Sequence, residues 1–177
     1  VECGVLEDPW AEPPRGPYTW TAEPEEAPDK PQYITITFKR GIPVALDGKQ
    51  MGGIELIETL NKIGGRHAVG RIDMIENRLV GIKSRETYEA PAAVILHTAH
   101  RALQSMTMSK DQLRFKYYVA VLYADLVYNG LWYTALHQDL MAYVQSSQRS
   151  VNGDVRMKLY KGSAVKVGVR SDDGLYA

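Results

Sequence analysis

The chain has 177 residues, of which 45% are hydrophobic, and its 21 basic side chains balance 21 acidic ones. This composition excludes wholesale disorder and is typical of about one domain with a buried core. A formal charge of zero argues against a general nucleic-acid binder, and the single cysteine, Cys3, excludes a scaffold held by internal disulfides. The most apolar stretch, residues 117–136, carries too many hydroxyl groups to predict a membrane span.

Residues 1–31 differ in composition from the rest of the chain. They carry eight acidic and two basic side chains and seven of the nine prolines, whereas residues 32–177 carry 13 acidic and 19 basic side chains. Because proline disfavours regular helix and central strand, we expect an extended arm here. Trp10 and Trp20 favour an arm that lies on a surface, of its own chain or of a partner, and the alternative is a disordered acidic linker.

The next part of the chain predicts a strand, a turn and a helix. Residues 33–38 alternate apolar and polar side chains, which is typical of a strand. Residues 40–43 should turn the chain into a short return strand, 44–46. Ile54, Ile57, Leu60 and Ile63 then recur near helical spacing, and Gly64 is the predicted stop of this helix.

Residues 71–83 predict a hairpin in which 72–75 and 79–82 flank the polar triplet 76–78. Three helices should follow. The first begins at Pro91 with an apolar face of Val94, Ile95, Ala99, Ala102, Leu103 and Met106. The second spans 110–128 behind a capping box of Ser109 and Gln112, with Val119, Leu122, Tyr123, Leu126 and Val127 on its apolar face, and the third spans about 136–149.

A closing hairpin is predicted at 155–169, with its turn at Lys161-Gly162. The order of elements predicts an α+β fold of antiparallel hairpins with a cluster of helices, preceded by the extended Pro-rich arm. We therefore divide the chain into an arm, 1–31, and an α+β domain, 32–177.

The familiar catalytic motifs are not found in the sequence. There is no G-x-x-x-x-G-K-[ST], G-x-G-x-x-G, H-E-x-x-H or G-x-S-x-G pattern. His97 and His100 could share a helical face, but no carboxylate lies near them in the sequence, so we expect surface or packing histidines and no metal site. We assign no catalytic residue.

The most informative stretch is 69–91, V-G-R-I-D-M-I-E-N-R-L-V-G-I-K-S-R-E-T-Y-E-A-P. It is dense in groups that recognise zwitterions, since carboxylates accept hydrogen bonds from ammonium or urea groups and a tyrosine hydroxyl both donates and accepts. These groups are Arg71, Asp73, Glu76, Arg78, Lys83, Ser84, Arg85, Tyr88 and Glu89. From composition alone, ion pairs across a solvated hairpin are the favoured interpretation.

This stretch resembles the argininosuccinate synthase family, whose pattern is V-G-R-[IV]-D-x-[IV]-E-N-R-x-[VI]-G-x-K-S-R-x-x-Y-E-x-P. The resemblance continues in dispersed segments through almost the whole chain, at 4–10, 60–61, 64–67, 105–107, 126–132 and 159–162. Departures are Ala90, Ala92 and Ala93, where the family commonly has threonine and glycines, and His97-Thr98, where a Tyr-His pair is usual.

The resemblance implies a ligase that joins citrulline and aspartate with ATP, giving argininosuccinate, AMP and pyrophosphate through a citrullyl-adenylate. Two residues of the family motif contact citrulline, and they match Glu76 and Tyr88 here. We expect these two side chains to hold the ureido group for attack rather than to transfer protons.

The resemblance also implies what the chain does not contain. The family's S-G-G-x-D-[ST] loop is not in the sequence, so ATP and Mg should be bound mainly by an N-terminal nucleotide-binding domain outside this chain, and the chain alone should be inactive. The implied assembly is a homotetramer in the cytoplasm, without nucleic-acid or membrane partners. The alternative function is a non-catalytic oligomerisation module derived from the same family.

Overall fold

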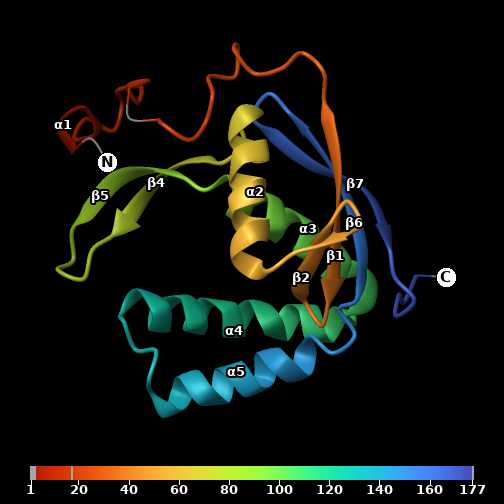
Figure 1. The fold of residues 1–177 in the computed structure, drawn as a ribbon. Coiled ribbons are helices and arrows are strands. Elements are labelled where there is room, and N and C mark those ends of the chain that lie inside the picture. The colour runs from red at the N-terminus through yellow and green to blue at the C-terminus, as the bar shows by residue number, and fades with distance from the viewer. Residues whose placement is uncertain (1–2, 17, 177) are drawn as a thin grey trace.

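A computed structural model describes residues 3–16 and 18–176 (Figure 1). The elements in chain order are α1 (Cys3–Leu6), β1 (Gln32–Lys39), β2 (Ile42–Leu46), β3 (Lys49–Gln50), α2 (Gly53–Arg66), β4 (Arg71–Asn77), β5 (Lys83–Glu89), α3 (Pro91–Thr107), α4 (Lys110–Tyr128), α5 (Ala135–Ser147), β6 (Gly153–Tyr160) and β7 (Ser163–Arg170). The predicted α+β fold with antiparallel hairpins and several helices is confirmed.

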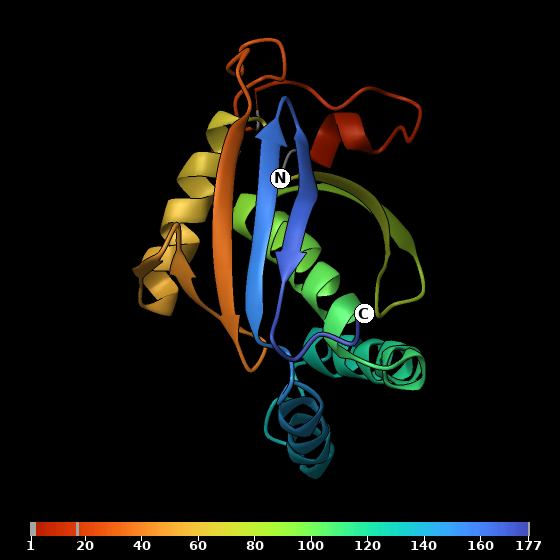
Figure 2. The same ribbon diagram turned by 90° about the vertical axis from the view of Figure 1, so that its right-hand side faces the viewer.

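Five strands form one antiparallel sheet in the order β3-β2-β1-β6-β7. α2 and α3 cover the same face of this sheet, and the opposite face carries no helix (Figure 2). Strands β1 and β6 pair in a register that sets Ile36 opposite Val155. Strands β4 and β5 form a separate two-stranded sheet that projects from this body beside α1 (Figure 1).

The main core lies between the sheet and the two covering helices. Alternate residues of β1 and β6 point inward, because successive side chains of a strand face opposite sides. They meet Leu56 and Leu60 of α2, and Ile95 and Leu103 of α3. A second, smaller cluster holds α4 against α5 and contains Val119, Leu126 and Leu140.

Two of the predicted apolar helix faces need correction. Ile54 and Ile57 are exposed and Leu56 is buried in their place, whereas the predicted Leu60 is buried and Ile63 packs against the core. The helix also continues through Gly64 to Arg66. Close packing explains why a glycine lies inside the helix here. α3 passes so near that a Cβ at this position would lie 2.8 Å from Pro91 Cβ. On α4, Leu122 of the predicted face is 52% exposed.

The other helix predictions are confirmed. α3 begins with Pro91 in its first turn, and its predicted face buries Ile95, Ala99 and Leu103. The capping box of α4 is present, since Ser109 Oγ accepts from the Gln112 N–H and the Gln112 side chain accepts from the Ser109 N–H. α5 spans Ala135–Ser147, close to the predicted 136–149.

The central hairpin is longer than predicted. Residues 79–82 were predicted as a strand, but they form the loop, and β5 begins at Lys83. The backbone N–H of Arg78 donates to Ile82 O at 2.8 Å and closes this loop. Glu76 therefore lies within β4, opposite Ser84, and not at the bend.

The prediction of an extended arm is not confirmed over its whole length. Cys3–Leu6 form the short helix α1, which precedes the first proline, Pro9. Beyond α1, the described residues up to Pro31 form bends and turns without strand pairing. Trp10 and Trp20 are 94% and 60% exposed, so the arm is not attached by burial of its tryptophan rings.

No helix within the described residues is long and apolar enough to cross a membrane. The stretch 117–136 comprises the second half of α4, a loop and the start of α5.

Candidate substrate-binding hairpin

The β4–β5 hairpin has two chemically different faces. Its register pairs Arg71 with Glu89 and Glu76 with Ser84, so alternate residues of both strands share a side. We call one side the arm face; its polar members are Arg71, Asp73, Asn77, Lys83, Arg85, Thr87 and Glu89. We call the other side the carboxylate face; its polar members are Glu76, Arg78, Ser84, Glu86 and Tyr88. Most charged side chains of residues 69–91 thus lie on one of these two faces, and the two faces make different contacts.

Arg71 on the arm face holds the segment after residue 17. Its guanidinium makes a bidentate ion pair with Glu23, at 3.0 Å to each carboxylate oxygen. The same group lies 4.0 Å from the centre of the Tyr18 ring and donates to Thr21 Oγ1. A planar, always charged fork is suited to such multiple contacts, so Arg71 serves to fix the arm.

Glu89 completes this attachment. Its carboxylate accepts from the backbone N–H groups of Thr19, Trp20 and Thr21, and from Thr21 Oγ1 at 2.7 Å. Burial alone would raise the pKa of Glu89, but these hydrogen bonds outweigh burial and hold the pKa below its ordinary value. The charged form of Glu89 is therefore part of the folded arm.

Arg85 attaches the first part of the arm. It pairs with Asp73 across the hairpin at 2.6 Å and donates to Ala11 O at 2.6 Å. The hydrogen bond from Arg85 is the main reason that the pKa of Asp73 is lowered. The interpretation of ion pairs across a hairpin is thus correct for Asp73 and Arg85 on the arm face, and also for Arg78 and Glu86 on the carboxylate face.

The two predicted citrulline residues meet on the carboxylate face. Tyr88 Oη donates to Glu76 Oε1 at 2.5 Å. The Glu76 side chain is 15% exposed and Tyr88 is 38% exposed, so the pair is neither sealed in a core nor fully solvated. This hydrogen bond, with burial adding to it, raises the pKa of Tyr88 to about 12. Tyr88 is therefore a protonated hydrogen-bond donor at neutral pH.

Arg78 occupies the centre of the carboxylate face. Its Nε donates to Ser84 Oγ at 2.6 Å, its Nη2 donates to Glu86 Oε1, and its Nη1 lies 3.5 Å from Glu76 Oε2. Burial alone would lower the pKa of Arg78, but Glu86 and Glu76 outweigh it and raise the pKa. Glu86 was not singled out from the sequence. Strand alternation could have identified it, because residues 84, 86 and 88 lie on one side of β5, the side that Glu76 of β4 shares.

An open cavity lies beside the hairpin. It has a volume of about 580 Å³ between α1 and the hairpin, and it is lined by Leu6, Glu7, Pro9, Ile75, Ile82, Lys83, Ser84, Arg85 and Glu86. Ser84 and Glu86 connect this cavity to the carboxylate face. Neither Glu76 nor Tyr88 lines it, so the cavity adjoins the predicted pair without containing it.

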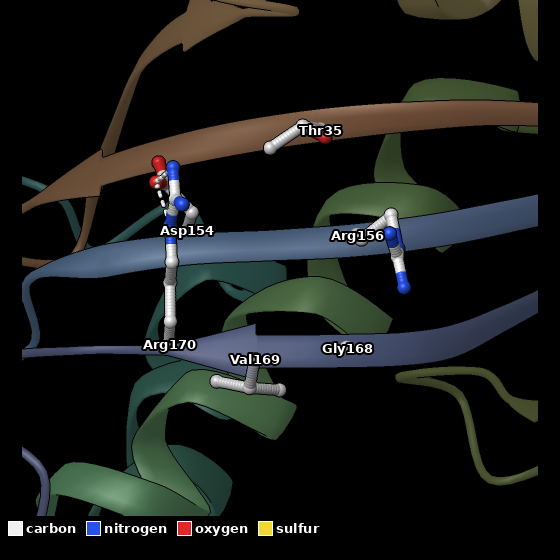
Figure 3. Close-up of a pocket in the computed structure, with 6 residues that line it drawn as sticks. All are labelled: Thr35, Asp154, Arg156, Gly168, Val169 and Arg170. Atoms are coloured by element: carbon white, nitrogen blue, oxygen red, sulfur yellow. Dashed lines mark hydrogen bonds and ion pairs between the residues drawn. The ribbon is translucent and has the colours of Figure 1, made fainter.

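A second cavity, of about 280 Å³, lies over the sheet face that carries no helix (Figure 3). Asp154 there accepts from Thr37 Oγ1 at 2.6 Å and pairs with Arg170 at 2.7 Å. The hydrogen bond from Thr37 is the main cause of the lowered pKa of Asp154. Figure 3 shows Val169 pointing to the other side, toward α3. Because its one carboxylate is already occupied, this cavity is a weaker candidate than the hairpin.

The two histidines of α3 have separate environments. His97 is exposed, while His100 stacks on Phe38 and its Nε2 lies 2.9 Å from Gln148 Oε1. Within residues 3–16 and 18–176, no group of three or more His, Cys, Asp or Glu side chains is placed to hold a metal ion.

Comparison with known proteins assigns the class of the chain. The family profile described as "Arginosuccinate synthase C-terminal domain" matches residues 1–177. Curated relatives named argininosuccinate synthase include proteins from Dehalococcoides mccartyi, 55% identical over 99% of this chain, and from Trichodesmium erythraeum and Rubrobacter xylanophilus, each 54% identical over all of it.

The chain therefore belongs to the argininosuccinate synthase family, as its C-terminal domain, and this confirms the resemblance seen in the sequence. The chain spans 43% to 44% of the length of these relatives, so it corresponds to less than half of a complete synthase.

Proposed function

We propose that this chain is the citrulline-contacting part of a complete argininosuccinate synthase, which joins citrulline and aspartate with ATP. In this reaction the ureido oxygen of citrulline attacks the α-phosphorus of ATP and pyrophosphate leaves. The aspartate amine then displaces AMP from the citrullyl-adenylate, forming the new C–N bond. Adenylation is needed because the ureido oxygen is otherwise a poor leaving group.

The observation that carries the proposal is the partly exposed Tyr88–Glu76 pair on the hairpin that bears the family motif. Glu76 offers carboxylate oxygens to the N–H groups of an amino-acid substrate. Tyr88 fixes one of those oxygens and offers a hydroxyl of its own. Both residues act by holding the substrate in position, which lowers the barrier by fixing the geometry of attack.

The missing components of the reaction belong to the remainder of the complete enzyme. ATP and its Mg are expected on the nucleotide-binding domain, because the family's S-G-G-x-D-[ST] loop is not found in this sequence. We accordingly propose that the isolated chain has no activity. We also place the enzyme in the cytoplasm, and a chain with a single cysteine needs no oxidising compartment for an internal disulfide.

The test replaces Glu76 with Gln, and Tyr88 with Phe, in the complete enzyme. Loss of a hydrogen bond to a charged group corresponds to roughly a tenfold change or more in affinity, so the KM for citrulline should rise about tenfold in each variant. The KM for ATP should change less than about twofold. Tyr33→Phe, on an exposed ring of β1, is the matched control and should leave all three KM values unchanged.

Unchanged citrulline kinetics in both Glu76→Gln and Tyr88→Phe would remove the pair from the substrate site. A separate assay of the isolated 177-residue chain with ATP, citrulline and aspartate should release no pyrophosphate. Release at the rate of the complete enzyme would contradict the proposed division of labour.

A second candidate function is assembly, because the surface of α4 and the following loop is rich in exposed apolar side chains. This assembly surface consists of Phe115, Tyr117, Tyr118, Val121, Leu122, Tyr128, Leu131, Trp132, Tyr133 and Leu136, each about half exposed or more. Large exposed apolar patches mark interaction sites. We propose that it contributes to a homotetramer, a role compatible with the ligase reaction.

A further inference from the structure

The guanidinium of Arg78 contacts three side chains of the carboxylate face. Each of its three nitrogens faces a different partner: Nε faces Ser84 Oγ, Nη2 faces Glu86 Oε1, and Nη1 faces Glu76 Oε2. These partners lie on both strands of the hairpin. The planar fork of an arginine therefore has one defined orientation here, set by Ser84 and Glu86.

Glu76 in turn is held at both oxygens. Its Oε1 accepts from Tyr88 Oη at 2.5 Å, and its Oε2 lies 3.5 Å from Arg78 Nη1. A carboxylate held at one oxygen alone can rotate about its last bond, whereas contacts at both oxygens fix its plane. Arg78 supplies the second of these two contacts. It therefore fixes the direction in which the free lone pairs of Glu76 point.

Arg78 also has an anchor outside the hairpin. Tyr128 Oη, at the end of α4, donates to Asn77 O at 3.1 Å and so holds the backbone next to Arg78. The Glu86 side chain is only 10% exposed, which leaves it little freedom to follow a displaced guanidinium. Arg78 itself is 38% exposed, so its orientation depends on these partners and not on burial of its own side chain.

We propose that Arg78 is a positioning residue for Glu76: it touches no substrate, and it orients the Glu76 carboxylate so that this group can receive the N–H groups of citrulline. The inference rests on the function proposed above. In the alternative, Arg78 only braces the hairpin, and its loss would weaken the fold without a specific effect on one substrate.

A double-mutant cycle in the complete enzyme separates these roles. Arg78→Gln should raise the KM for citrulline about tenfold, like Glu76→Gln, with less than about twofold effect on the KM for ATP or aspartate. In the Glu76→Gln background, Arg78→Gln should add less than about twofold, because the group through which it acts has lost its charge. Arg101→Gln, an exposed arginine on α3, is the matched control.

Arg78→Lys is the second variant, in case the glutamine variant does not fold. Lysine keeps the charge but cannot face three partners in one plane, so the citrulline KM should lie between those of the wild type and Glu76→Gln. Thermal melting measured in parallel shows whether each variant is folded.

Three outcomes are decisive. If Glu76→Gln leaves citrulline kinetics unchanged, the proposed substrate site fails. If Glu76→Gln raises the citrulline KM but Arg78→Gln and Arg78→Lys do not, only the positioning role fails. If the effects of Arg78→Gln and Glu76→Gln multiply fully in the double variant, Arg78 acts independently of Glu76 and the inference is overturned.

Discussion

At the scale of single residues, two imidazoles, one buried and one half-buried, couple the fold to pH. His67 is 2% exposed just after α2, and its Nδ1 has no hydrogen-bond partner within residues 3–16 and 18–176. Burial is the main cause of its lowered pKa, with the nearby charge of Arg66 adding to it. Burial likewise lowers the pKa of His100, although its hydrogen bond with Gln148 opposes this. Both rings are therefore neutral in the folded protein near neutral pH.

We expect the free energy of unfolding to fall as the pH drops below about 6.5. The unfolded chain binds protons at these rings with the ordinary pKa of 6.5, while the folded chain resists protonation, so stability is lost as the pH falls from 6.5 toward the lower folded pKa values. Urea midpoints at pH 5, 6 and 7 measure this. His67→Gln with His100→Gln should flatten the dependence.

His97→Gln is the control for this prediction, because His97 is exposed and its replacement should keep the wild-type slope. The lowered carboxylates, Asp73, Glu89 and Asp154, titrate below about 4.5 and lie outside this window. A wild-type midpoint that is equal at pH 5 and pH 7 would contradict the role of the two rings.

The family resemblance, and not residue type or spacing, singled out Glu76 and Tyr88 in the sequence, and it left the roles of their neighbours open. Arg71, Arg85 and Glu89 have the same chemistry as the carboxylate face, and only the strand register shows that they point to the arm. That register depends on where the loop begins. Because residues 79–82 are apolar, their pattern resembled a strand, although the backbone hydrogen bond from Arg78 to Ile82 closes a loop there.

At the scale of elements, the approach of α2, β4 and α3 depends on Gly70. It has φ +112°, and a Cβ there would lie 2.4 Å from the backbone nitrogen of Pro91. The N–H of Ala90 donates to Gly70 O at 2.8 Å, so both ends of the hairpin meet at this point. Gly70 therefore sets the direction in which the hairpin leaves the main body.

We predict that Gly70→Ala is far more destabilising than Gly48→Ala. Gly48 has φ +80° in open space, so its replacement costs about 1–2 kcal/mol for the left-handed conformation alone. At Gly70 a clash with backbone adds about 1–3 kcal/mol, because the contacting atoms cannot move aside as a side chain can. Chemical denaturation of both variants measures the difference, and equal midpoints would refute the prediction.

The presence of a helix or strand was predictable where the spacing of apolar residues and the capping residues indicate the same element. The capping box of Ser109 and Gln112 and the alternation of β1 identified their elements correctly. The errors arise where packing overrides a local signal. Gly64 indicates a helix end, yet contact with Pro91 gives a glycine another use inside the helix. No local pattern could reveal that contact, because its two members are separated by the whole hairpin.

At the scale of the whole molecule, α4 and α5 form a pair that is only lightly joined to the main core (Figure 1). Their shared cluster is small, and it leaves Val121 and Leu122 64% and 52% exposed. Tyr128 ties the end of α4 to the hairpin through Asn77 O. A partner that covers the assembly surface would therefore also fix the helix that borders the carboxylate face.

We predict that Val121→Lys with Leu122→Lys reduces the assembly size of the complete enzyme. Both side chains are exposed in the single chain, so lysines there leave the protomer folded, as far-UV circular dichroism should show. In an apolar interface the same charges would lose their water without gaining a partner, which opposes association. Light scattering after size exclusion should show a tetramer for the wild type and for the control Lys62→Glu on α2, and a smaller species for the double variant. A double variant with the mass of the wild type would exclude this surface from the interface.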